Sequence, residues 1–129
     1  MSSYNSSYIS LKFVVHGISH KNGRENNEDN FVIAKLESWS LSSELHLEPG
    51  LLHEIALLAV ADGVGGLEAG EVASGIFVRT LEKEFVNMVS RAQAGSEELI
   101  SSLTYAFRKA NLLILNELSK KGKRGGTTG

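Results

Sequence analysis

Apolar residues recur along this chain with two different periods, which divide the sequence into two parts. Residues 11–19, 31–36 and 55–61 are rich in β-branched and aromatic side chains that partly alternate with polar ones, which is typical of strands. The first two lie close enough across the polar loop 20–30 to form an antiparallel pair. A longer excursion, 37–54, contains the only proline and precedes the third strand.

The second part of the chain has helical periodicity. Apolar spacing predicts one amphipathic helix over about residues 69–91 and another that begins at Ser96, a plausible N-cap, and ends near Lys120. Two such helices, joined by a short break, should pack antiparallel with their apolar faces turned to the sheet. The closing residues 123–129 resemble the approach to a further strand. The expected core positions are Ala73, Phe77, Leu81, Phe85 and Met88 on the first helix and Leu99, Leu103, Ala106, Ala110 and Leu113 on the second.

Composition excludes several classes of function. The 129 residues, 42% hydrophobic and 22% charged, suit one globular domain with a real core. A net charge of −2 without a basic block argues against nucleic acid or an anionic membrane as partner. No cysteine is present, which rules out disulfides and thiolate ligands. The N-terminus lacks the layout of a signal peptide and no apolar run could span a bilayer, so we expect a soluble, cytoplasmic protein.

The first candidate for chemistry is the Asp62-Gly63 pair at the end of the third predicted strand. Further glycines follow at positions 65, 66 and 70. A carboxylate at a strand end, followed by backbone that a ligand can approach closely, offers oxygen ligands to a hard divalent cation. Asp-Gly is also a common turn pair, and for this pair alone a strand-to-helix turn is the favoured interpretation. A dinucleotide fingerprint is rejected, because Glu68 occupies its last glycine position.

The second candidate is the polar loop around Glu28 and Asp29. Adjacent carboxylates point to different sides of an extended chain, so one could face a metal and the other its water shell. Arg24 could supply the planar fork that suits a phosphate. The alternative is a solvated polar loop, which is what a charged cluster usually is.

The two candidates belong to a set of four motifs that occur in a particular order along the chain. Together they resemble the metal-dependent serine/threonine protein phosphatases of the PP2C (PPM) family, most closely its bacterial branch. The motifs are Arg24-x-x-Asn27-Glu28-Asp29-Asn30, Ala59-Val60-Ala61-Asp62-Gly63-Val64-Gly65-Gly66, Ala69-Gly70-Glu71-x-Ala73-Ser74 and Gly126-Thr127-Thr128.

The resemblance implies an α+β fold, an antiparallel β-sandwich flanked by helix pairs. Residues 1–129 would be the N-terminal portion of one such domain, with about three to five strands, two long antiparallel helices and the C-terminal half absent. We therefore expect weak metal binding, negligible turnover by this chain alone and association through unpaired strand edges.

The resemblance also implies an activity, the hydrolysis of phosphoserine and phosphothreonine in a protein substrate. In this family two Mn²⁺ or Mg²⁺ ions activate a bridging water that attacks the phosphorus directly. By the same resemblance, Asp62 would bridge the metals and the Gly63 carbonyl would bind one of them. Glu28 and Asp29 would bind a metal directly or through its water, and Arg24 would clamp the substrate phosphate.

One position departs from many eukaryotic members of the family. Val64 stands where they carry a histidine proposed as the general acid, so protonation of the leaving group is unassigned. Residues 70–74 would serve packing rather than chemistry.

Two alternatives stay open. One is a non-catalytic phosphatase-like module that binds a phosphoprotein or a kinase partner, and the other is a small cation-binding α/β domain unrelated to phosphate. The sequence does not determine the oligomeric state.

Overall fold

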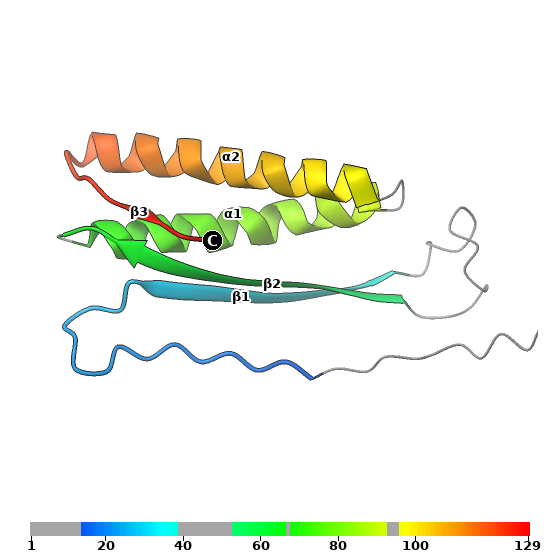
Figure 1. The fold of residues 1–129 in the computed structure, drawn as a ribbon, viewed down its shortest axis with the longest axis horizontal. Helices are drawn as coiled ribbons and strands as arrows, with labels where there is room; N and C mark the ends of the chain where they lie inside the picture. The colour runs from blue at the N-terminus through cyan, green and yellow to red at the C-terminus, as the bar shows by residue number, and fades with distance from the viewer. Residues whose placement is uncertain (1–13, 39–52, 67, 93–95) are drawn as a thin grey trace, which may run out of the picture.

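A three-stranded sheet, a helix packed on it and a second helix packed on the first make up the fold (Figure 1). The computed structural model describes residues 14–38, 53–66, 68–92 and 96–129. The predicted excursion 37–54 therefore lies mostly outside the described residues. The elements are β1 (Asp29–Ser38), β2 (His53–Val64), α1 (Ala69–Ala92), α2 (Ser96–Lys120) and β3 (Gly126–Thr127).

The sheet is antiparallel throughout, with the strand order β1-β2-β3. The pairing of β1 with β2 runs from Asp29 opposite Asp62 to Ser38 opposite His53. The short β3 pairs with the end of β2, where Thr127 lies opposite Gly63. The closing segment, expected only to approach a further strand, thus already forms one. The α+β class and the antiparallel strands are confirmed.

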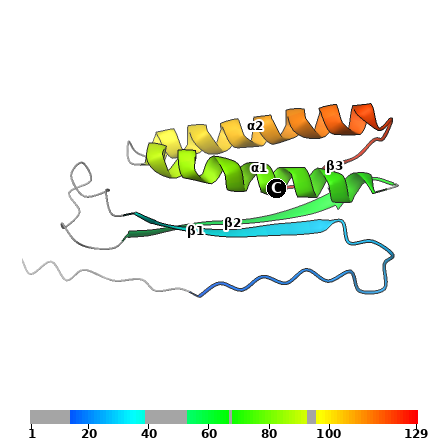
Figure 2. The same ribbon diagram turned by 180° about the vertical axis from the view of Figure 1, so that it is seen from behind.

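The first predicted strand, 11–19, is wrong in its described part. Residues 14–19 form no strand, and the antiparallel partner of β1 is β2 rather than this segment. The segment follows the outer face of the sheet (Figure 2). There, Gly17 lies against the ring of Phe31. Val14 and Ile18 remain 83% and 89% exposed. A strand-like sequence pattern reflects side-chain packing on a sheet surface more than an intrinsic backbone preference. The exposed side chains of Val14 and Ile18 make no such packing, so the pattern did not produce a strand.

Helix α1 provides most of the core, and all five of its predicted core positions are buried. It contacts the three strands through small residues, of which Ala69 and Ala73 are fully buried, as is Ala61 on β2. Further along the helix, Phe77 meets Phe107 of α2 edge to face, with ring centroids 4.9 Å apart. No helix in the described ranges is long and apolar enough to cross a membrane.

The predicted core stripe of α2 is wrong at both ends. Leu99 and Leu113 are 36% and 44% exposed. The two helices are antiparallel, as predicted, but α2 packs mainly on α1 rather than on the sheet (Figure 1). Residues spaced four apart form a ridge that fits the grooves of a neighbouring helix. Because α2 packs on α1 in this way, its buried residues follow such a ridge and differ from the predicted core positions. The buried row is Ser102, Ala106, Ala110, Ile114 and Leu118.

Leu81 should be one of the most sensitive core positions, because its side chain is only 1% exposed between α1 and its neighbours. We expect Leu81→Ala to lower the free energy of unfolding by about 2–5 kcal/mol through lost transfer energy and the cavity left behind. Urea unfolding followed by circular dichroism measures this. Leu112→Ala on α2, at a position 61% exposed, is the control and should change stability by less than about 0.5 kcal/mol. Equal losses in the two variants would contradict the described core.

Candidate functional site

Two aspartates face each other where β1 begins and β2 ends. Asp29 lies directly opposite Asp62 in the register. The backbone of Asp62 points away from β1, because its N–H donates to Thr128 Oγ1 (3.0 Å) and its carbonyl accepts from the Thr128 N–H (2.9 Å). Asp29 and Asp62 are therefore a non-hydrogen-bonded pair, the kind in which cross-strand side chains approach most closely. Both are exposed on the sheet face opposite α1.

Like charges directly opposite each other destabilise a sheet. A divalent cation between two carboxylates removes this repulsion, and Mg²⁺ is commonly held by one or two carboxylates while it keeps several waters. Two opposed carboxylates are thus ligands of the kind that a hard cation takes, with waters completing its coordination. Within the described part of the chain, no group of three or more acidic, histidine or cysteine side chains is arranged to hold a metal ion.

Glu28 and Gly63 meet at the first turn of α1. The Gly63 N–H donates to the Glu28 carbonyl (3.2 Å). Gly70 packs against both residues, since a Cβ on it would lie 2.8 Å from the Glu28 carboxyl carbon and 2.9 Å from the Gly63 carbonyl carbon. The Glu28 carboxylate thus lies at the positive end of the α1 dipole, which favours a negative charge. The structure brings these two predicted site residues together, on the α1 side of the sheet.

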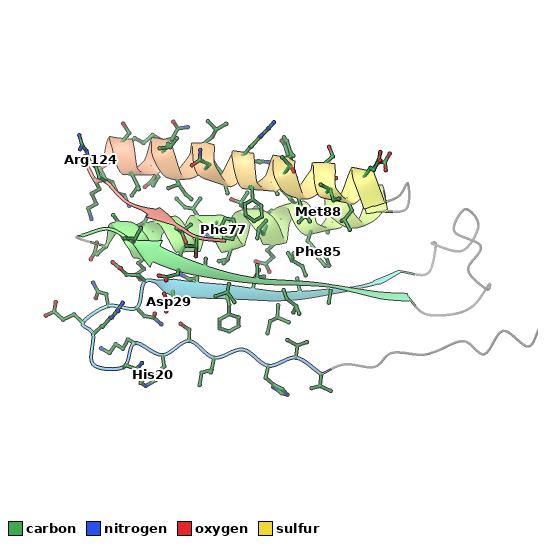
Figure 3. The ribbon with its side chains drawn as sticks, in the orientation of Figure 1. His20, Asp29, Phe77, Phe85, Met88 and Arg124 are labelled. Carbon is green, nitrogen blue, oxygen red and sulfur yellow. The ribbon has the colours of Figure 1, made fainter. Side chains whose placement is uncertain are left out.

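The loop before β1 is fixed by its own polar side chains. Asn27 Oδ1 accepts from the Asp29 N–H (3.1 Å), and Asn27 Nδ2 donates to Ser19 Oγ (2.5 Å). Ser19 Oγ in turn donates to the Asp29 carbonyl (3.3 Å). Figure 3 shows Asp29 at the start of β1, beside this loop. The sequence did not point to Ser19, because its contacts with Asn27 and Asp29 are not local. The turn itself had a local signal, since an asparagine two residues before Asp29 is typical of an Asx turn.

Arg24 lies in an exposed turn closed by a hydrogen bond from its own N–H to the Lys21 carbonyl (3.1 Å). The turn is at the same end of the sheet as the start of β1 (Figure 1). Its guanidinium makes no hydrogen bond or ion pair with another described residue, so it is available to an anion. The structure does not bring it into contact with Asp29 or Asp62.

The turn from β2 to α1 depends on a second close approach. Gly65 has a φ of 145°, and a Cβ on it would lie 2.8 Å from the Arg124 carbonyl oxygen. Lys123, next to Arg124, pairs with Glu68 in the same turn (3.5 Å). The residues that lead from α2 into β3 therefore close over the glycine turn (Figure 3). Only glycine combines this φ with this contact.

A separate ion pair joins the two helices. Lys109 on α2 donates to the largely buried Glu84 on α1 (2.6 Å). This hydrogen bond, with the charge of Glu84, raises the pKa of Lys109. Because the folded-state pKa is raised, the stabilisation is present below the usual lysine pKa and is lost as the pH rises through the raised value.

Gly63 should tolerate no side chain, because backbone surrounds it. A Cβ there would meet the carbonyl oxygens of Glu28 and Gly70. We expect Gly63→Ala to lower the free energy of unfolding by about 1–3 kcal/mol through overpacking against backbone that cannot yield. Gly66→Ala is the matched control, since nothing lies within 4 Å of its added methyl group. Thermal unfolding compares the two. Full tolerance of Gly63→Ala would show that β2, Glu28 and α1 are less tightly joined than described.

Comparisons of the chain with protein-family models, with curated proteins and with solved structures find no match.

Proposed function

We propose that this chain forms part of the metal site of a PP2C-type phosphatase that hydrolyses phosphoserine and phosphothreonine in proteins. The observation that carries the proposal is the Asp29–Asp62 pair, directly opposed across β1 and β2, with both residues exposed on the sheet face opposite α1. Such a pair is costly unless a cation lies between its members. The PP2C-like motifs around both residues add phosphate chemistry to the cation site.

In this proposal, Asp29 and Asp62 hold Mn²⁺ or Mg²⁺ on the sheet face opposite α1, and the Gly63 carbonyl supplies a further oxygen. The Glu28 carboxylate, which lies on the α1 side against Gly70, would have to turn around the strand end to reach the same ion. A bound cation supplies Lewis acidity, which lowers the pKa of a water and stabilises charge on a phosphoryl group. Arg24, whose guanidinium has no partner among the described residues, binds the phosphate with a planar pair of donors. Two hydrogen bonds hold the Asp62 backbone in place before any ligand arrives: its N–H donates to Thr128 Oγ1, and its carbonyl accepts from the Thr128 N–H.

A second candidate is a phosphatase-like module that binds a phosphoprotein without hydrolysis. The observation that favours it is Val64, which is 66% exposed directly beyond the Asp62-Gly63 pair. Valine cannot donate a proton to a leaving alkoxide, so this position offers no general acid. The two candidates share the cation and the phosphate contact and differ only in turnover.

Substitution of Asp62 tests the cation site. We expect Asp62→Asn to weaken Mn²⁺ binding at least about tenfold, because a neutral amide replaces one of two charged ligands and each 1.4 kcal/mol lost is a factor of ten. Electron paramagnetic resonance of free Mn²⁺ measures the affinity. Phosphate release from a phosphothreonine peptide by the full-length gene product, with and without Mn²⁺, measures turnover. Glu82→Gln, which removes an exposed carboxylate on α1, is the control and should change neither quantity.

The outcomes separate the candidates. Mn²⁺-dependent release that is lost in Asp62→Asn supports the phosphatase. Mn²⁺-dependent peptide binding without release supports the binding module. Mn²⁺ affinity that is equal in Asp62→Asn and Glu82→Gln would overturn both, since the opposed pair would then hold no cation.

A further inference from the structure

Ser74 on α1 is fully buried, yet its hydroxyl bonds outside its own helix. Its Oγ lies 2.6 Å from the Glu28 carbonyl oxygen and 3.3 Å from that of Glu71. It also accepts a hydrogen bond from Asn30 Nδ2 (2.9 Å). A hydroxyl has one proton to donate, and the shorter distance assigns it to Glu28. Ser74 therefore joins α1 to the loop before β1 rather than to its own preceding turn.

The two residues that Ser74 binds are the neighbours of Asp29. The Glu28 carbonyl also accepts from the Gly63 N–H, so its peptide is fixed to β2 and to α1 at once. Asn30, on the other side of Asp29, is fixed to the same hydroxyl through its side chain. Ser74 does not touch Asp29, which faces the opposite side of the sheet. It restrains the backbone on both sides of that residue.

We propose that Ser74 is a positioning residue for the cation site, which holds the Glu28–Asn30 backbone where Asp29 faces Asp62. The inference rests on the proposed function in that it assumes a cation between these aspartates. It goes beyond packing, which would account for a buried small residue but not for one hydroxyl bonded to both neighbours of a ligand. Groups that orient metal ligands typically change metal affinity by about 10–100-fold when removed.

The test is Ser74→Ala against Ser102→Ala. Ser102 is also a buried helical serine, but its hydroxyl donates only to Glu98 of its own helix (2.8 Å). We expect Ser74→Ala to weaken Mn²⁺ binding about tenfold and Ser102→Ala to leave it unchanged. A merely structural role would move the thermal midpoint of both variants and the Mn²⁺ affinity of neither.

A second measurement needs no metal. The Gly63 amide donates to the carbonyl that Ser74 also holds, so its hydrogen exchange should become about tenfold faster in Ser74→Ala and stay unchanged in Ser102→Ala. If Ser74→Ala does not fold, Asn30→Ala removes one of the two restraints and should weaken Mn²⁺ binding by a smaller factor.

The outcomes distinguish this inference from the proposed function. Mn²⁺ binding by the unmodified protein that is equal in Ser74→Ala, or in Asn30→Ala where that variant is used, overturns the positioning role and leaves the proposed function intact. No Mn²⁺ binding by the unmodified protein overturns both. Weaker binding in Ser74→Ala, with faster exchange at Gly63 and neither change in Ser102→Ala, supports the positioning role.

Discussion

The register of β1 against β2 is the constraint on which the rest of this structure depends. It places Asp29 opposite Asp62 and, in the same alternation, turns Val32 and Ala61 toward α1. A slip of one residue would reverse the faces of a whole strand, sending its core residues outward and separating the two carboxylates. One strand pairing therefore sets both the faces of the core residues and the positions of the two aspartates.

Several contacts fix the backbone at the Asp29–Asp62 end of the β1–β2 pairing. Thr128 satisfies both backbone groups of Asp62 from the β3 side, while Gly63 bonds to Glu28 from the β1 side. Gly70 and Gly63 lack side chains at the point where α1 comes closest to β2. These contacts fix the backbone positions of the two opposed aspartates, so that the pairing itself cannot shift to separate them.

Helix α1 both packs on the sheet and anchors the loop before β1. Its small residues allow it to lie close to the sheet, and this close approach lets Ser74 reach the loop before β1. α2 contributes little directly to the sheet but packs along α1, and the Phe77–Phe107 contact joins the two helices. The core thus supports the site through α1, and the chain that leaves α2 returns to β2 as β3.

The sequence by itself located the strands and helices whose hydrophobic residues recur with a regular spacing. Its alternating and helical patterns placed β1, β2, α1 and α2 within a few residues, and identified Asp62 as a charge at the end of a strand. Its strand-like pattern at 11–19 was misleading, because a local pattern does not say whether a packing surface exists. The four motifs also predicted that the loop at 28–29 and the strand end at 62 lie together, though not in which register they meet.

Only the tertiary structure decided which segments pair and which hydroxyls hold them. Ser74 lies 46 residues from Glu28, and Asp62 lies 66 residues from Thr128, so no local rule relates them. The buried line of α2 likewise follows from its contact with α1 rather than with the sheet. Periodicity describes a segment against an average environment, whereas register, helix rotation and polar anchoring depend on the particular neighbour that each segment meets.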